Sequence, residues 1–209
     1  MILNYLSGAV LGLICGAISA FFTQGGLGKR QRKLFLRLLR KKGRIRRQRL
    51  LCLAAGLLLG LIGVWICDGV NRSFAGFITV MSCLFHASLT DLRKREIHLD
   101  AMLFYALVLL IYQLSAADWS VLLSALIGGA VGAALLGVPY LLRRNSVGVG
   151  DIALLAVCGL YYGARGVIAL LLRALILLAV VALVQLLRRR ATKESELPIA
   201  PFLFFSALI

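Results

Sequence analysis

The amino-acid sequence predicts an all-α, polytopic membrane protein, a helical bundle of about seven or eight transmembrane segments. Of its 209 residues 61% are hydrophobic, and the mean hydropathy is +0.95, which is more apolar surface than a soluble core of this size can bury. Most hydrophobic residues stand in runs close to the roughly 20 residues that a helix needs to cross hydrocarbon. The charged residues cluster between these runs. We therefore expect lipid to be the solvent of this fold.

The first predicted segment covers residues 2–22 and carries Gly8, Gly12 and Gly16 at four-residue spacing. Residues four apart share one helix face, so this face is predicted to pack closely on a neighbouring helix. No basic region precedes the apolar run and no small-residue cleavage site follows it. We therefore expect the segment to be retained, not removed as a signal peptide.

A strongly basic segment follows at residues 29–49, with twelve Lys or Arg and no acidic residue. Its apolar residues recur at helical spacing, which predicts an amphipathic helix that binds anionic membrane lipid. The net charge of +16 could also suggest nucleic acid, but charges placed between apolar segments are typical of membrane topology instead. We expect no nucleic-acid partner, and we divide the chain into residues 1–49 and a membrane-embedded core at 50–209.

Six further apolar segments are predicted along the core. They cover residues 50–67, 74–90, 99–114, 121–142, 152–162 and 167–187, and a short apolar tail covers 198–209. The segment at 121–142 contains Gly128, Gly129, Gly132 and Gly137, which permit close approach of a second backbone. The segment at 152–162 is short for a full crossing.

Basic residues predict the orientation of these segments. If the segments alternate and the loop at 29–49 is cytoplasmic, 21 of the 24 Lys and Arg fall in cytoplasmic loops. The N-terminus is then outside. The loop that begins near residue 91 and the loop that ends near residue 151 then both lie at the cytoplasmic face.

Two aspartates at this face are the candidate site residues. Asp91 follows the segment at 74–90, and Asp151 ends the stretch Gly148-Val149-Gly150-Asp151 and opens the segment at 152–162. Ionisable residues at the edge of an apolar span are costly, which makes them functional candidates. Two carboxyl groups that share one proton can act as base on water and acid toward a peptide carbonyl, as in aspartic proteases. Gly148 and Gly150 would let the backbone bend and admit a peptide chain.

Other interpretations of the same aspartates stay open. Asp151 could be an N-cap of the helix that starts at residue 152, and Asp91 could pair with Arg93 or Arg95. A proton-coupled transporter could use both as a relay, although we find no internal repeat of the kind that transporters contain. A catalytically silent membrane scaffold is a further alternative. We predict no metal and no organic cofactor, because the five cysteines stand singly and His86 and His98 have no metal-ligand spacing.

The motifs resemble those of the type IV prepilin peptidases, membrane proteases of the Gly-x-Gly-Asp type. Three stretches between residues 82 and 203 carry the resemblance. They are Asp91-Leu92-Arg93 with Ile97, Gly148-Val149-Gly150-Asp151 with Leu154, and the tail Pro198-Ile199-Ala200-Pro201-Phe202-Leu203. His98 and Ala153 depart from the family pattern, which usually has Pro and Lys there. The cysteine-rich N-terminal domain of larger members is missing, so a methyltransferase activity is unsupported.

The resemblance implies a function and a location. The chain would be an intramembrane aspartic endopeptidase of the inner membrane, with Asp91 and Asp151 as its catalytic pair and no cofactor. It would remove the basic leader from prepilin or pseudopilin precursors, at the cytoplasmic face, in pilus assembly or secretion. The sequence makes no prediction of the oligomeric state.

Overall fold

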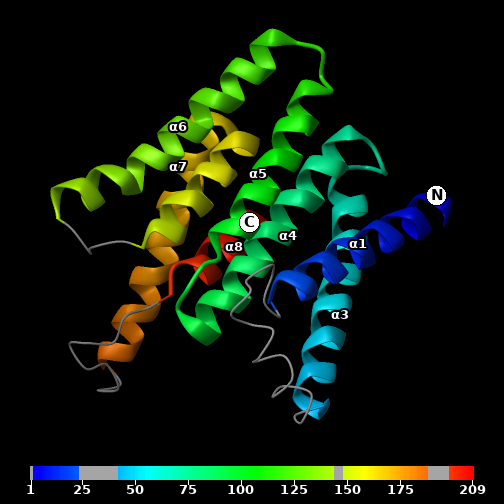
Figure 1. Cartoon of the computed structure of the whole chain (residues 1–209), viewed down its shortest axis with the longest axis horizontal. Coiled ribbons are helices and arrows are strands. Elements are labelled where there is room, and N and C mark those ends of the chain that lie inside the picture. The colour runs from blue at the N-terminus through cyan, green and yellow to red at the C-terminus, as the bar shows by residue number, and fades with distance from the viewer. Residues whose placement is uncertain (1, 24–41, 144–147, 188–197) are drawn as a thin grey trace. The chain divides into compact units, whose positions relative to one another are not determined.

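The computed structural model describes residues 2–23, 42–143, 148–187 and 198–209, and it confirms an all-α fold (Figure 1). No strand occurs in these ranges. The helices are α1 (Ile2–Thr23), α3 (Lys42–Ile66), α4 (Arg72–Lys94), α5 (Leu99–Leu114), α6 (Trp119–Leu142), α7 (Val149–Leu187) and α8 (Ala200–Leu208). They form two compact units, Met1–His86 and Ala87–Ile209, which are described separately. The division expected after residue 49 stays a prediction.

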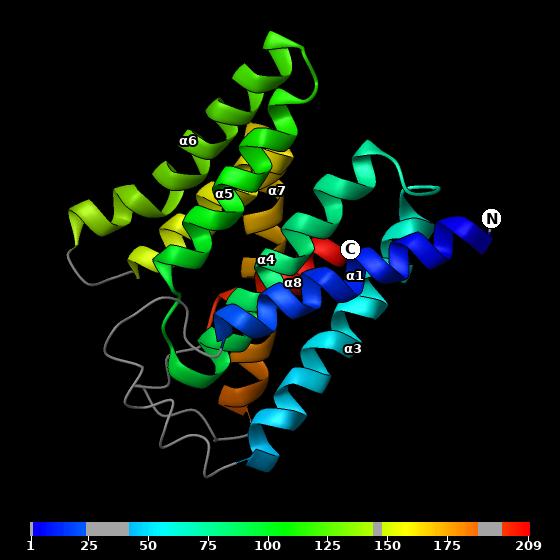
Figure 2. The same cartoon turned by 45° about the vertical axis from the view of Figure 1, so that its right-hand side comes forward.

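In the first unit, α1 packs on α3 through glycines of both helices (Figure 2). A Cβ added at Gly12 would overlap the carbonyl oxygen of Gly56, and one added at Gly8 would lie 3.3 Å from the carbonyl oxygen of Gly60. The two backbones are therefore in direct contact, which only glycine permits at these positions. The predicted packing face of the first segment is confirmed, and its partner is α3.

Polar contacts connect α1 to the first part of α4 in the same unit. The hydroxyl groups of Ser19 and Ser82 lie 3.0 Å apart, and the Ser82 hydroxyl donates to the Cys15 carbonyl oxygen at 3.3 Å. Asn71 precedes α4, and its side-chain oxygen accepts a hydrogen bond of 3.0 Å from the Phe74 N–H. This cap satisfies one of the unpaired N–H groups at the start of the helix, which explains why α4 begins here.

In the second unit, α6 runs antiparallel to the first part of α7. Gly128 contacts Gly159, and Gly132 contacts the backbone of Leu155 one turn further along. The predicted close approach is confirmed for these glycines, whereas a Cβ added at Gly137 would meet nothing within 4 Å. Small residues on both helices bring the two backbones together.

Gly163 divides α7 into two arms, because its φ of +68° interrupts the helical backbone. Figures 1 and 2 show that the chain changes direction within α7. The predicted short segment at 152–162 corresponds to the first arm, but that arm begins earlier, at Val149. The second arm carries the segment predicted at 167–187.

Three of the described helices are long and apolar enough to cross a membrane. They are α6, α7 and the part of α4 from Arg72 to Arg93, while α1, α3 and α5 carry the shorter apolar runs Asn4–Ala20, Leu50–Ile66 and Leu99–Leu114. The nine residues of α8 extend about 14 Å at 1.5 Å per residue, so α8 alone cannot span hydrocarbon. The predicted count of seven or eight crossings stays a prediction.

The basic segment predicted at 29–49 is only partly described. Residues 24–41 lie outside the described residues. From Lys42 onward the backbone belongs to α3, so residues 42–49 continue the helix that was expected to begin at residue 50. Binding of this segment to anionic lipid stays a prediction.

Candidate functional site

Asp91 lies near the C-terminal end of α4 and is 8% exposed. Its Oδ2 atom accepts a hydrogen bond of 3.1 Å from the backbone N–H of Ala200, a residue 109 positions later in the chain. Ala200 is the first residue of α8. A buried carboxyl group needs such a donor, because burial without a partner is costly.

The start of α8 leaves one N–H for this carboxyl group. The N–H groups of Phe202 and Leu203 donate to the carbonyl oxygen of Ile199, at 3.0 and 3.2 Å, and Pro201 has no N–H. Ala200 therefore supplies the remaining donor of the first turn. The positive end of the helix dipole also favours a negative charge at this position.

A second hydrogen bond holds α8 in place. The Ser206 hydroxyl donates to the carbonyl oxygen of Leu170 in the second arm of α7, at 2.9 Å. Ala200, Leu203 and Ser206 are all buried, so α8 is packed along one face. The sequence indicated this tail only as a motif, and its contact with Asp91 was not predicted.

Asp151 is the third residue of α7, not the residue before the helix. The carbonyl oxygen of Gly148 accepts hydrogen bonds from the N–H groups of Asp151 and Ile152, at 3.0 and 3.3 Å, and the Gly148 N–H donates to the Asp151 carboxylate. This reciprocal pair resembles a capping box with Gly148 as N-cap. The alternative that Asp151 is itself an N-cap is therefore wrong, because α7 starts two residues before it, at Val149.

The two glycines of the motif have different surroundings. Gly148 is exposed, and a Cβ added there would lie 3.0 Å from Oδ2 of Asp151. A Cβ added at Gly150 would lie 2.6 Å from the Cβ of Ile97. Ile97 belongs to the loop between α4 and α5, so the absence of a side chain at Gly150 lets this loop approach the start of α7. The admission of a peptide chain by Gly148 and Gly150 stays a prediction.

The structure brings the carboxyl groups of Asp91 and Asp151 within electrostatic range of each other. They come from the end of α4 and the start of α7. Arg95, the residue after α4, has a φ of +54° and also acts electrostatically on Asp91, whereas an ion pair of Asp91 with Arg93 or Arg95 stays a prediction. A negative charge on one of these carboxyl groups therefore disfavours a negative charge on the other.

The two histidines do not belong to a group of potential metal ligands within the described residues. His86 is fully buried in α4, and His98 precedes α5 without a side-chain cap. Across the part of the chain that the structure describes, no three His, Cys, Asp or Glu side chains are grouped so that they could hold a metal ion.

The fold and the site define a class: an all-helical membrane protein in which carboxyl groups from two helices interact near the helix ends. Comparison with known families places the chain within this class. The family model described as the type IV leader peptidase family matches residues 78–183, just over half of the chain and including both aspartates. The chain belongs to the type IV leader peptidase family. It therefore has a leader-peptidase type of function, with prepilin-type substrates in general.

No curated protein and no solved structure matched the chain. The family match ends before α8. Ala200, whose N–H donates to Asp91, therefore lies outside the residues that the family model covers.

Proposed function

We propose that this protein is an aspartic endopeptidase that removes the basic leader from type IV prepilin or pseudopilin precursors. Asp91 and Asp151 are its catalytic pair, and no metal or organic cofactor takes part. The observation that carries the proposal is the electrostatic interaction between these two carboxyl groups, in a chain of the type IV leader peptidase family.

The mechanism uses the two carboxyl groups in different protonation states. The ionised group takes a proton from water, which attacks the carbonyl carbon of the scissile peptide bond, and the protonated group donates to the carbonyl oxygen. The group that received the proton from water then gives it to the amide nitrogen, and the other group takes one back from a hydroxyl of the tetrahedral intermediate. The C–N bond breaks, which releases the new carboxyl end and the new amino end. Each carboxyl group accepts a backbone N–H at the start of a helix, Asp91 from Ala200 and Asp151 from Gly148, and such donors stabilise a carboxylate. Either aspartate can therefore be the ionised partner while the other holds the proton.

The position of the pair supports cleavage at a membrane surface. Asp91 is three residues from the end of α4, and Asp151 is the third residue of α7. The basic loops predict that this is the cytoplasmic side of the inner membrane. A leader that stays in the cytoplasm would be cut there from the apolar segment that follows it. A relay for proton-coupled transport would instead require acids near the middle of the membrane.

Cleavage of a prepilin-type precursor in liposomes tests the proposal. Wild type, Asp91→Asn and Asp151→Asn are compared by mass spectrometry of the leader junction, with Asp100→Asn as the matched control. Asp100 is an exposed acid in the first turn of α5. Removal of a general acid or base should lower the rate by about a hundredfold or more. The control should cut at the wild-type rate.

The alternatives give different results in the same preparation. Cutting by either asparagine variant at the wild-type rate contradicts the aspartic mechanism. No cutting by the folded wild type, together with proton-dependent uptake that both variants abolish, would identify a transporter. Absence of both activities would point to the membrane scaffold.

A further inference from the structure

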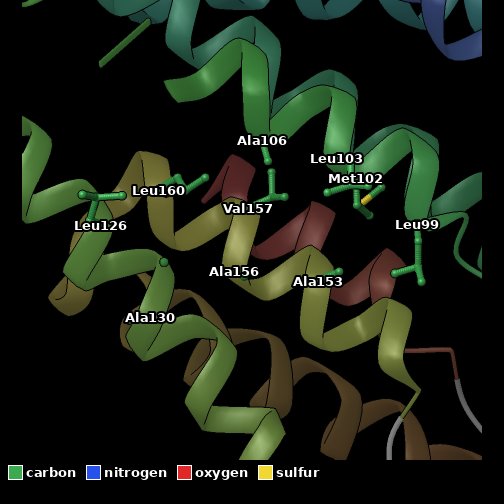
Figure 3. Close-up of a pocket in the computed structure, with 11 residues that line it drawn as sticks. Leu99, Met102, Leu103, Ala106, Leu126, Ala130, Ala153, Ala156, Val157 and Leu160 are labelled. Atoms are coloured by element: carbon green, nitrogen blue, oxygen red, sulfur yellow. The ribbon is translucent and has the colours of Figure 1, made fainter. Parts of the chain in front are cut away.

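Gln113 connects the end of α5 to the first arm of α7 in the second unit. Its side chain is buried, and its Nε2 donates a hydrogen bond of 2.8 Å to the backbone carbonyl oxygen of Leu160. Figure 3 shows the two helices on either side of an apolar pocket that residues from 99–106 of α5 and from 153–160 of α7 line. A buried amide is costly unless it is paired, so this bond specifies which part of α7 lies against the end of α5.

The hydrogen bond lies beside the break in α7. Leu160 is three residues before Gly163, where φ is +68° and ψ is −179°, a combination that is essentially restricted to glycine. The last turn of a helix has carbonyl groups that need donors from outside the helix. Gln113 supplies such a donor and therefore caps the first arm where the chain changes direction.

Side-chain packing around the break is open on one side. A cleft of about 630 Å³ lies there, and Gln113, Ser124 and Gly163 are among the residues that line it. A Cβ added at Gly163 would lie 3.5 Å from Oγ of Ser124, which is an ordinary contact. Because packing constrains the two arms only weakly on this side, the hydrogen bond from Gln113 has a large share in fixing them.

The second arm holds α8 and, through it, a hydrogen bond to Asp91. The carbonyl oxygen of Leu170 in this arm accepts from the Ser206 hydroxyl of α8, and the N–H of Ala200 at the start of α8 donates to Asp91. Leu170, Ser206 and Ala200 are fully buried, so the second arm and α8 are packed against each other at this contact. A movement of the second arm therefore moves the donor that Asp91 accepts.

A small rotation at the break is enough for this effect. Leu170 is seven residues after Gly163, about 10 Å along the helix, so a rotation of about 6° displaces it by about 1 Å. The hydrogen bond from Ala200 to Asp91 is 3.1 Å long, and a displacement of this size takes it beyond hydrogen-bonding distance.

We propose that Gln113 is a positioning residue for Asp91. It holds Leu160 beside the break at Gly163, fixes the direction of the second arm of α7, and so keeps the Ala200 N–H on the Asp91 carboxyl group. Leu160 is nine residues, about 14 Å, along α7 from Asp151, so Gln113 acts at a distance from the carboxyl pair. The expected effect on cleavage rests on the proposed function, whereas the expected effect on Ala200 does not.

The NMR signal of the Ala200 amide tests the inference without cleavage. The full-length protein is labelled with carbonyl-¹³C isoleucine and ¹⁵N alanine in detergent micelles, so that only the Ile–Ala pairs at 152–153, 168–169 and 199–200 give signals. Ala153→Gly and Ala169→Gly each remove one signal, which assigns the third to Ala200. Asp91→Ala then gives the position of the Ala200 amide proton without its hydrogen bond.

Gln113→Met keeps the length of the side chain and removes the donor. We expect it to move the Ala200 amide proton most of the way to its position in Asp91→Ala. Gly163→Ala changes the break itself and should move the same signal. Each spectrum is recorded below the melting temperature of the variant, so that unfolded protein does not contribute.

Ser115→Ala is the matched control. The Ser115 hydroxyl donates to the Tyr112 carbonyl oxygen at 2.7 Å, a side-chain hydrogen bond at the same end of α5 that does not reach α7. Its Ala200 signal should be that of the wild type. An unmoved Ala200 signal in folded Gln113→Met overturns the inference, and a lowered melting temperature without a shift would leave Gln113 a purely structural role.

Cleavage is measured separately as kcat and KM. Gln113→Met should lower kcat about threefold, the effect of one hydrogen bond between membrane helices, with KM unchanged. Ser206→Ala acts on the same route, so the double variant should also be about threefold slower, whereas independent effects would multiply to about ninefold. A ninefold loss, or a change in KM alone, contradicts the route through α8.

The two proposals fail separately. A shifted Ala200 signal in Gln113→Met, with no cleavage by the folded wild type, would leave the positioning route standing and refute the peptidase. Cleavage by the wild type with an unmoved Ala200 signal in Gln113→Met would leave the peptidase standing and refute the positioning role.

Discussion

Gly150→Ala adds one methyl group at the contact between the start of α7 and the loop after α4. The new Cβ would lie 2.6 Å from the Cβ of Ile97, whereas ordinary contacts begin at 3.4 Å. The loop or the helix must therefore move by about 0.8 Å. Asp151 is the next residue, so this movement changes its position relative to Asp91.

The displacement gives an expected magnitude. Because a misplacement of about 1 Å in an active site can cost about a hundredfold in rate, we expect Gly150→Ala to lower precursor cleavage by roughly 10- to 100-fold. Overpacking of this kind also destabilises a fold by about 1–3 kcal/mol. The melting temperature is therefore measured alongside the rate, so that loss of folded protein is not mistaken for loss of geometry.

Two further variants separate the contact from other effects of the methyl group. Gly137→Ala is the matched control, since its Cβ meets nothing within 4 Å, and it should cut at the wild-type rate. Ile97→Gly combined with Gly150→Ala removes the Cβ contact and leaves the Ile97 carbonyl oxygen at 3.1 Å, so part of the lost rate should return. A wild-type rate for Gly150→Ala, or a double variant as slow as the single one, would refute this reasoning.

Two other predictions follow from hydrogen bonds at helix ends. Ser206→Ala removes the hydroxyl that donates to Leu170 and holds α8, and a hydrogen bond between helices in a membrane is worth about 0.6 kcal/mol. Because α8 would then hold Asp91 less firmly, the cleavage rate should fall about threefold. An unchanged rate contradicts a role for α8 in positioning Asp91. The Ser120 hydroxyl and N–H donate to Asp118 and hold the pKa of this carboxyl group below its usual range. The cap therefore stabilises α6 fully when the pH is above the ordinary pKa of a carboxyl group. This stabilisation is lost as the pH falls through the lowered pKa of Asp118. Asp118→Ala should remove that part of the pH dependence of thermal unfolding, and an unchanged acid limb would show that the cap contributes nothing.

Much of the helical framework could be predicted from local composition. The predicted segment at 74–90 lies within α4, which covers Arg72–Lys94, and the one at 121–142 nearly equals α6, which covers Trp119–Leu142. Apolar runs specify helices in lipid because each helix satisfies its own backbone hydrogen bonds. The glycine spacing in α1 likewise indicated a packing face, although it could not identify α3 as the partner.

Helix boundaries near the site were harder to predict, because glycine gives no local signal for where a helix starts. The stretch from Gly148 to Asp151 was interpreted as a loop before a helix. In the structure α7 already begins at Val149 and Gly148 serves as its N-cap. The difference moves Asp151 into the first turn, where its carboxylate accepts the Gly148 N–H.

The amino-acid sequence was enough to predict that this protein is helical, that its solvent is lipid, and that Asp91 and Asp151 are its candidate pair. These conclusions depend on composition and on motifs within a few residues. Tertiary packing, by contrast, brings the Ala200 N–H to Asp91 from 109 residues away and places Ile97 in the space at Gly150. Such contacts depend on how helices distant in the chain pack together, and no local pattern of residues specifies that packing.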